Sequence, residues 1–289
     1  MTTIHDALSD AKQRFAPIST SASLDAQLLL AEILGVNRAY LIAHSEKTLT
    51  PEQTAHYESW VTRRVGGEPI AYILGRQAFY DRDFIATPAV LIPRPETEHL
   101  LELALDFARE HPLATVVDVG TGSGALAVTL AAHAPQATVY ATDISPDALT
   151  VARQNAEKYS ASITFLCGDL LTPLVERQIR VDLIMANLPY IPTAELNRLA
   201  VSQYEPRLAL DGGTDGLVVI RRLLGQAATI IRPAGMILLE IGADQGQAVV
   251  HLAQTILQSA QVEIYQDYAR LDRVVQMQLP LDADIGGIP

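Results

Sequence analysis

The sequence predicts an α/β fold in which helices cover both faces of a mainly parallel, seven-stranded sheet, preceded by a small helical domain. Its 289 residues are enough for one large domain or two unequal ones, and 49% of them are hydrophobic, which supplies a core. From residue 96 onward short β-branched runs alternate with longer helical stretches, as in a parallel sheet with crossover helices. Before residue 70 the apolar residues recur at helical spacing instead.

Residues 1–70 are expected to form the helical domain. One helix should have Ser23 as its N-cap and Gly35 as its end. A second should begin at Thr50, with Pro51 in its first turn and Gln53 completing a capping box, and end near residue 66. The apolar residues of the first helix lie at helical spacing: Leu24, Leu28, Leu29 and Ile33.

Residues 71–95 are expected to form a β-hairpin linker. Aromatic and β-branched residues alternate there with turn formers between Phe79 and Phe84, and a proline-rich segment, residues 92–95, follows. Neither stretch has a helical pattern.

Residues 96–289 are expected to form the sheet domain. The last two strands are joined by a short connection, so we expect them to form an antiparallel hairpin at the sheet edge. The predicted strands are residues 115–119, 138–142, 162–166, 181–186, 236–241, 262–268 and 273–278. The predicted helices are residues 96–109, 124–133, 146–159, 217–231 and 245–259.

Composition excludes several classes of protein. The net charge is −12 and no run of basic residues is present, which disfavours a nucleic-acid partner. No apolar stretch approaches the ~20 residues that span a bilayer, so a cytoplasmic protein without membrane contact is expected. The protein is also expected to be a monomer. The single cysteine, Cys167, excludes an internal disulfide and is predicted to be buried, and the seven histidines show no metal-ligand spacing.

A glycine-rich turn between a buried strand and a helix predicts an adenosine cofactor. Its glycines let the backbone turn sharply and approach a ligand, and Asp143 follows 19 positions after the last of them, where a carboxylate can accept ribose hydroxyls. The pattern also fits dinucleotide sites, so NAD remains an alternative. The predicted cofactor residues are Asp118, Gly120, Thr121, Gly122, Ser123, Gly124, Asp143 and Asn187.

A second polar segment, Asn187-Leu188-Pro189-Tyr190, follows the fourth strand and should face the same crevice. The Asn187 side chain and the Leu188 carbonyl can each accept a hydrogen bond, Pro189 stiffens the turn, and Tyr190 offers a flat face for stacking. Two acceptors suit a conjugated NH₂ group, because they orient it and help to localise its lone pair. The segment therefore predicts methyl transfer to a planar, amide-type nitrogen.

Five segments together resemble the release factor glutamine methyltransferases (the PrmC or HemK family). They are residues 92–98 (IPRPETE), 118–124 (DVGTGSG), 187–190 (NLPY), 204–213 (YEPRLALDGG) and 272–275 (DRVV). The helical N-terminal part and the hairpin match as well, so the resemblance covers nearly the whole chain.

The resemblance implies a class I S-adenosylmethionine-dependent methyltransferase with a Rossmann-like sheet. Its substrate would be the side-chain amide nitrogen, N5, of the glutamine in a release factor's Gly-Gly-Gln motif, and its by-product S-adenosylhomocysteine, with no metal. Residues 187–190 would hold the glutamine. Because a glutamine side chain is too small to specify a protein substrate by itself, residues 1–70 are expected to recognise the substrate, or alternatively only to brace the catalytic domain. Asp169 and Leu170 would lie at the adenine, where some members have an aromatic residue instead of Leu170. Leu188 stands where the family usually has proline, but the carbonyl that the amide needs belongs to the backbone.

Four further residues have open roles. Arg94 and Glu96 either shape the substrate pocket or belong to the start of a helix. Glu205 and Arg207 are expected to pair, either as a structural ion pair or to hold a loop over the site.

Three alternative functions are considered. An adenine-N6 or guanine-N2 methyltransferase would need a basic channel and stacking aromatics for a flipped base. An NAD-dependent oxidoreductase would have no use for residues 187–190. A non-catalytic binding protein could keep the fold without turnover.

Overall fold

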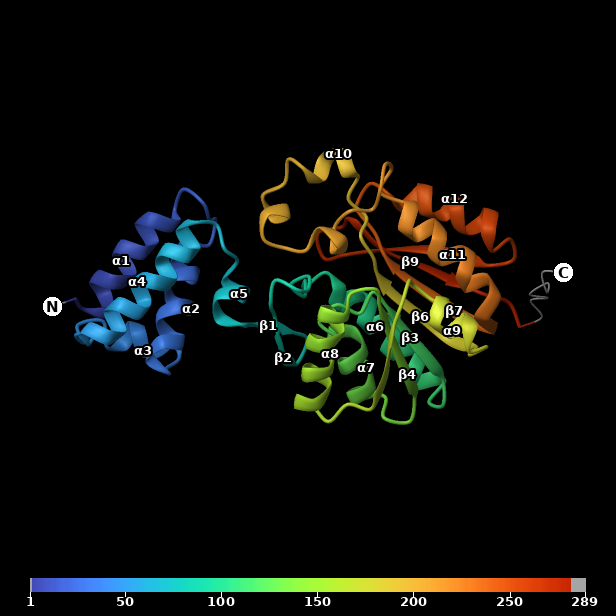
Figure 1. Ribbon diagram of the computed structural model, residues 1–289, viewed down its shortest axis with the longest axis horizontal. Helices are drawn as coiled ribbons and strands as arrows, with labels where there is room; N and C mark the ends of the chain where they lie inside the picture. The colour runs from blue at the N-terminus through green and yellow to red at the C-terminus, as the bar shows by residue number, and fades with distance from the viewer. Residues whose placement is uncertain (1, 282–289) are drawn as a thin grey trace. The chain divides into compact units, whose positions relative to one another are not determined.

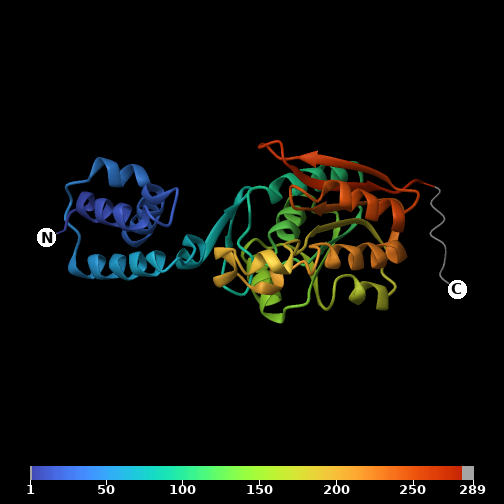
Figure 2. The ribbon, with the colours of Figure 1, turned by 90° about the horizontal axis from the view of Figure 1, so that it is seen from above.

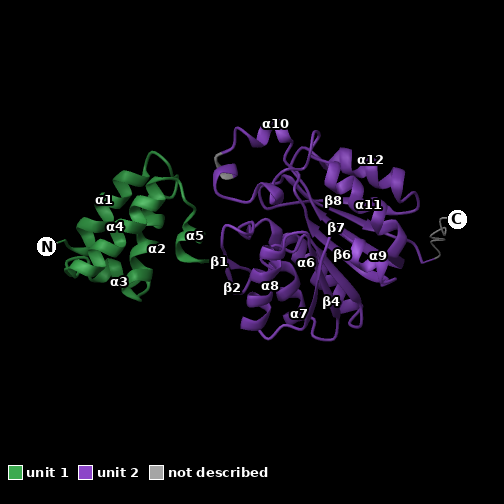
Figure 3. Cartoon of the chain, viewed as in Figure 1, with its two compact units in different colours: residues 1–76 green, residues 77–289 purple. Residues whose placement is uncertain are grey.

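The computed structural model describes residues 2–281, so residues 282–289 of the predicted sheet domain lie outside the described part of the chain. The chain divides into two compact units, residues 1–76 and residues 77–289 (Figure 3). Within residues 2–281, every helix is too short or too polar to cross a bilayer.

Unit 1 consists of helices packed around a core of their own, with α1, α2 and α4 side by side (Figures 1 and 2). Its largest buried side chains include Phe15, Leu29 and Leu41, none of which is exposed to solvent. The helices are α1 (Ile4–Phe15), α2 (Ala22–Leu34), α3 (Arg38–Ala43), α4 (Pro51–Val65) and α5 (Ile70–Leu74).

The helix ends in unit 1 confirm two of the predicted signals and correct one. Thr50 and Gln53 form the predicted capping box, with bonds of 3.2 and 2.9 Å, and Gly35 ends α2 in the left-handed conformation. Ser23 is not the N-cap of α2, because the helix begins at Ala22. The preceding Ser21 is the N-cap residue, and its hydroxyl donates to the buried carboxylate of Asp25 (2.9 Å).

A two-stranded hairpin, β1 (Arg76–Phe79) and β2 (Arg82–Ile85), is present in the segment where a hairpin was predicted. The short helix α5 precedes it and was not predicted. This helix is brief because Pro69 stands before it and Gly75 ends it with a left-handed φ of 72°.

The seven-stranded sheet of unit 2 confirms the predicted α/β fold. Its strand order is β5-β4-β3-β6-β7-β9-β8, with β9 antiparallel to both of its neighbours, so the predicted edge hairpin is present. β7 begins at Ile231, five residues before its predicted start. The proline and the glycine in these five residues concealed this part of the strand. The strands are β3 (Thr115–Val119), β4 (Thr138–Asp143), β5 (Ile163–Cys167), β6 (Val181–Asn187), β7 (Ile231–Glu240), β8 (Gln261–Gln266) and β9 (Asp272–Gln278).

Helices cover both faces of this sheet (Figure 1). Side chains alternate between the two resulting cores, so that Val116 packs into one core and Val117 into the other. One face carries α6 (Thr97–Glu110), α7 (Ala125–His133) and α8 (Pro146–Lys158), and the other α9 (Thr172–Glu176), α11 (Val218–Ile230) and α12 (Gly246–Ile256). Between β6 and α11 lie α10 (Thr193–Leu196) and the 3₁₀ turns η1 (Ala200–Gln203) and η2 (Arg207–Ala209).

Cys167 is exposed, which corrects the expectation of a buried thiol. The apolar run before it suggested burial, but β5 is an edge strand of the sheet. Cys167 is the last residue of that strand, and its sulfur lies 3.9 Å from the carbonyl oxygen of Ile144.

Candidate active site

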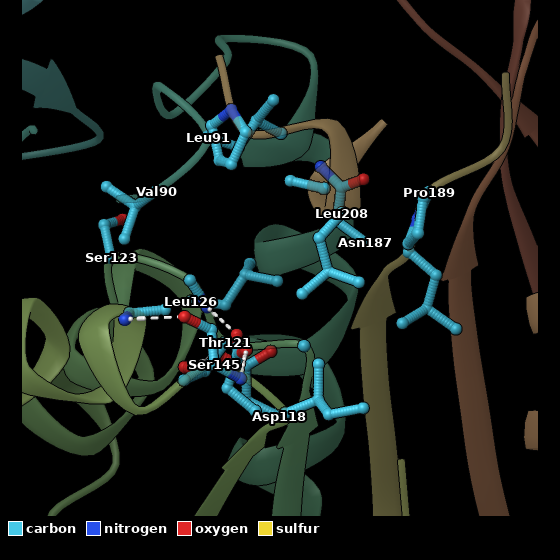
Figure 4. Close-up of a pocket in the computed structure, with 18 of the residues that line it drawn as sticks. Val90, Leu91, Asp118, Thr121, Ser123, Leu126, Ser145, Asn187, Pro189 and Leu208 are labelled. Carbon is cyan, nitrogen blue, oxygen red and sulfur yellow. Dashed lines mark hydrogen bonds between the residues drawn. The ribbon is translucent and has the colours of Figure 1, made fainter. Parts of the chain in front are cut away.

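A cavity of about 230 Å³ lies at the carboxyl ends of β3, β4 and β6. The strand order reverses between β3 and β6, and in open α/β sheets such a switch point is where ligands bind. Figure 4 shows Asp118, Thr121 and Ser145 at one end of the cavity and Asn187 toward another. The predicted site residues that line it are Arg94, Asp118, Gly120, Thr121, Gly122, Ser123, Asp143, Asp169, Leu170, Asn187, Leu188 and Pro189. Gly124, Tyr190 and Glu96 do not line it.

The glycine-rich turn needs its glycines for different reasons. All three have positive φ: 70° at Gly120, 54° at Gly122 and 81° at Gly124. At Gly120 a Cβ would lie 3.1 Å from the Leu188 side chain, so glycine lets the turn approach the neighbouring strand end. At Gly124 a Cβ would lie 3.2 Å from Ala152 of α8. Gly124 therefore allows the start of α7 to pack closely against α8, and it does not line the cavity.

Asp118 is a buried carboxylate beneath the turn, 1% exposed. Its Oδ2 atom accepts hydrogen bonds from the Thr121 hydroxyl (2.6 Å) and from the backbone N–H of Ala127 (3.2 Å). These bonds tie the turn to the first residues of α7. Burial raises the pKa of Asp118 to about 7, although both hydrogen bonds act in the opposite direction.

This pKa predicts a pH dependence of stability. The folded state binds the Asp118 proton more tightly than the unfolded state, where the pKa is near 3.8, so burial lowers the free energy of unfolding as pH rises from 3.8 to about 7. Asp118→Asn cannot titrate and keeps a side-chain acceptor, so we expect a smaller decline over this range. Urea unfolding of the wild type and the variant at several pH values measures it. The exposed Asp244→Asn serves as the control, and an unchanged decline in Asp118→Asn would contradict the prediction.

Asp143 joins the glycine turn to the next helix. Its two carboxylate oxygens accept from the backbone N–H groups of Gly122 and Ser145, each at 2.9 Å. Burial raises its pKa, against the effect of these bonds. The backbone N–H of Ile144 also interacts with this carboxylate, whose two oxygens have about four lone pairs in all, so Asp143 can still accept a hydroxyl group of a ligand in the cavity.

Asp169 and Leu170 line the cavity after β5. Leu170 has a φ of 50° and is 8% exposed, so its side chain adds apolar surface. Asp169 forms an ion pair with Arg222 of α11, which also lines the cavity. Sequence reasoning missed Arg222, because nothing near it in the chain marks a site.

Asn187, at the end of β6, presents a free acceptor. Its Nδ2 atom donates to the hydroxyl of Thr97 (3.0 Å), which directs its Oδ1 atom to the opposite side. Among residues 2–281, no hydrogen bond reaches Asn187 Oδ1 or the Leu188 carbonyl. One side-chain acceptor and one backbone acceptor, on neighbouring residues, therefore lie beside the glycine turn in the same cavity.

Tyr190 lies behind the cavity wall. Its hydroxyl is 3.4 Å from Glu240 Oε1, and its carbonyl accepts from Gln245 Nε2 (2.9 Å). Burial raises its pKa to about 12. The Tyr190 hydroxyl thus ties the turn after β6 to β7, and its carbonyl ties this turn to the N-cap residue of α12. Stacking of the ring on the substrate stays a prediction.

The loop after α10 closes another side of the cavity with Pro206, Leu208 and Ala209. The predicted pair of Glu205 and Arg207 is wrong. Glu205 is buried and accepts from Arg94 (2.5 Å) and from the backbone N–H of Ile92 (3.1 Å). Arg207 bonds to Asp211 instead (3.0 Å), because the two lie one turn apart around η2. Arg94 therefore fixes the loop, while Glu96 is exposed at the start of α6.

Comparison with known proteins gives two family matches. Residues 6–75 match the PrmC N-terminal domain, and residues 116–204 match a methyltransferase domain. A release factor glutamine methyltransferase from Moorella thermoacetica is 45% identical over 275 residues, covering 94% of this chain and 96% of the relative. The chain belongs to the release factor glutamine methyltransferase family.

A second member of the family, from Koribacter versatilis, is 44% identical and covers 77% of this chain and 80% of its own. Among solved structures, a methyltransferase from Pyrococcus furiosus superposes with a TM-score of 0.52 at 16% identity, covering 78% of this chain and 99% of that one. This likeness shows the fold alone. Across the described residues 2–281, no three His, Cys, Asp or Glu side chains are grouped so that they could hold a metal ion.

Proposed function

We propose that this methyltransferase transfers a methyl group from S-adenosylmethionine to the N5 amide nitrogen of the glutamine in the Gly-Gly-Gln motif of a peptide chain release factor. The observation that carries the proposal is the pair of free acceptors, Asn187 Oδ1 and the Leu188 carbonyl, in the cavity of the glycine turn. The names of the family's members support the choice of substrate.

The cofactor half of the cavity fits an adenosine. The glycine turn leaves room for a ligand close to the backbone, Asp143 can accept ribose hydroxyls, and Leu170 offers apolar surface to a base. S-adenosylmethionine, when bound, supplies a methyl group on a positively charged sulfur. Asp169 has a second carboxylate oxygen that can accept from an adenine amine beside its pair with Arg222.

The substrate half of the cavity fits a primary amide. An amide nitrogen is a weak nucleophile, because its lone pair is delocalised into the carbonyl group. Accepting its two N–H bonds at Asn187 and Leu188 holds the nitrogen in place and favours a localised lone pair directed at the methyl group. As the new N–C bond forms, the bond between the methyl group and the cofactor sulfur would break and leave S-adenosylhomocysteine. The nitrogen then loses one of its protons to water, so no general base is needed beforehand.

The alternatives fit less well. A nucleic-acid methyltransferase is disfavoured by the net charge of −12 and by family membership. An NAD-dependent oxidoreductase and a non-catalytic binding protein are disfavoured by the matched methyltransferase domain together with the free acceptors at Asn187 and Leu188. The proposal includes a cytoplasmic, monomeric enzyme without a metal or a nucleic-acid partner, whose residues 1–70 recognise the release factor.

Mass spectrometry tests the proposed reaction. The purified protein is incubated with labelled S-adenosylmethionine and, in parallel, with a release factor, tRNA, rRNA and DNA. We expect a mass increase of one methyl group on the glutamine of the Gly-Gly-Gln peptide, and none in a release factor whose glutamine is replaced by alanine. Label that enters only nucleic acid would overturn the proposal, and S-adenosylhomocysteine binding compared with NAD binding checks the cofactor.

A further inference from the structure

Four polar side chains form a continuous hydrogen-bonded chain that begins at the cavity: Asn187 and Thr97 line the cavity, whereas Glu240 and Tyr190 do not. Asn187 Nδ2 donates to Thr97 Oγ1 (3.0 Å), and Thr97 Oγ1 donates to Glu240 Oε2 (2.6 Å). The Tyr190 hydroxyl lies 3.4 Å from the other Glu240 oxygen. Pairing of β6 with β7 places Asn187 opposite Glu240, and both Thr97 and Glu240 are at most 5% exposed.

The direction of these bonds decides which atom of Asn187 faces the cavity. A hydroxyl has one proton, and Thr97 gives its proton to the Glu240 carboxylate. Toward Asn187, Thr97 can then only accept, so the NH₂ group of Asn187 must face Thr97 and its Oδ1 atom must face away. A flipped amide would present NH₂ to the N–H bonds of a substrate amide, donor against donor.

We propose that Thr97 and Glu240 are positioning residues that fix the amide of Asn187 with its oxygen toward the substrate nitrogen. Glu240 sets the direction of the Thr97 hydroxyl, and Thr97 in turn sets the orientation of Asn187. The inference rests on the proposed function, since it matters for catalysis only where the substrate presents N–H bonds to Asn187. Glu240 does not line the cavity, and Thr97, which does, acts through its bond to Asn187.

Protonation of Glu240 should weaken this control. Burial raises the pKa of Glu240 to about 7, while Thr97, the Arg273 charge and Tyr190 lower it and Glu96 raises it. A neutral Glu240 can donate to Thr97, which releases the Thr97 proton toward Asn187 and permits the flipped amide. Turnover should therefore fall as pH decreases through about 7.

Three variants test the inference with a release factor as substrate. Thr97→Val keeps the shape but loses the hydroxyl, and we expect turnover to fall by about 10-fold to 100-fold, as for other lost orienting bonds. Thr97→Ser keeps the hydroxyl and should stay within a few-fold of the wild type. Glu240→Gln can donate to Thr97, so its turnover should be low and should lack the decline through pH 7. S-adenosylhomocysteine affinity should remain within a few-fold in all three, which also shows that they fold.

A second measurement separates this inference from the proposed function. In NMR spectra of the wild type, the Asn187 NH₂ protons should show an Overhauser effect to the Thr97 methyl group, which Glu240→Gln should weaken. If the effect is present but the wild type does not methylate the release factor, only the proposed function fails. Wild-type turnover in Thr97→Val, equal losses in Thr97→Val and Thr97→Ser, or an unchanged pH profile in Glu240→Gln would overturn the inference.

Discussion

Asn187→Ala is expected to reduce turnover by roughly 10²–10³-fold, as when one preorganised polar contact is deleted from an active site. The substitution removes Oδ1, the free side-chain acceptor in the cavity, and leaves the Leu188 carbonyl as the only partner for the substrate amide. The glycine turn and Asp143 are untouched by it. Affinity for S-adenosylhomocysteine should therefore stay within a few-fold, as measured by calorimetry beside the turnover assay.

The matched control is Asn197→Ala, which removes another asparagine side chain from unit 2. Asn197 is exposed, bonds to Arg207 and does not line the cavity. Its turnover should equal that of the wild type. Wild-type turnover in Asn187→Ala would refute the role of Asn187, and a large loss of cofactor affinity would assign it to the cofactor half of the site instead.

Gly216→Ala should lower the stability of the protein. Gly216 has a φ of 72°, and a Cβ there would overlap the Tyr190 carbonyl oxygen and lie 2.7 Å from Gln245 Nε2. The added methyl group would break the bond between these two atoms and displace the turn that follows Asn187. We expect the free energy of unfolding to fall by roughly 2–5 kcal/mol from the left-handed strain, the overlap and the lost bond together. Urea unfolding measures the effect.

Gly225→Ala is the control for this substitution. Gly225 lies inside α11, and no atom would come within 4 Å of its Cβ. Alanine in a helix interior should stabilise unit 2 by about 0.5–1 kcal/mol. If Gly216→Ala unfolds at the same urea concentration as the wild type, the close packing of this loop against Tyr190 does not contribute as we argue.

The fold and the centre of the site could be predicted because both depend on local signals. Strand and helix periods indicated the sheet, and parallel strands bring their carboxyl ends to one edge. The glycine turn and Asn187 each follow such a strand directly, so their meeting could be foreseen. The antiparallel hairpin of β8 and β9 could be predicted because the connection between these two strands is too short for a crossover.

The remaining site residues depend on contacts that local patterns do not encode. Thr97 and Glu240 meet 143 positions apart, through the way α6 packs on β7, and nothing near either residue indicates the other. Glu205 forms an ion pair with Arg94 and not with Arg207, because the Arg207 side chain points toward Asp211 around η2. Tyr190 was expected beside Asn187 in the cavity but does not line it, because the sequence does not show which side of the turn faces the cavity.

The exposed position of Cys167 allows a spectroscopic probe to be attached to the enzyme. It is the single cysteine of the chain, so a thiol-reactive fluorophore would attach at one place without any engineered mutation. Cys167 pairs with Asp143 across β5 and β4, and Asp169 follows two residues later. A dye there would sit at the margin of the cofactor half of the cavity, where ligand arrival changes its surroundings. Cofactor association could then be followed in real time, without radioactivity and without a release factor present.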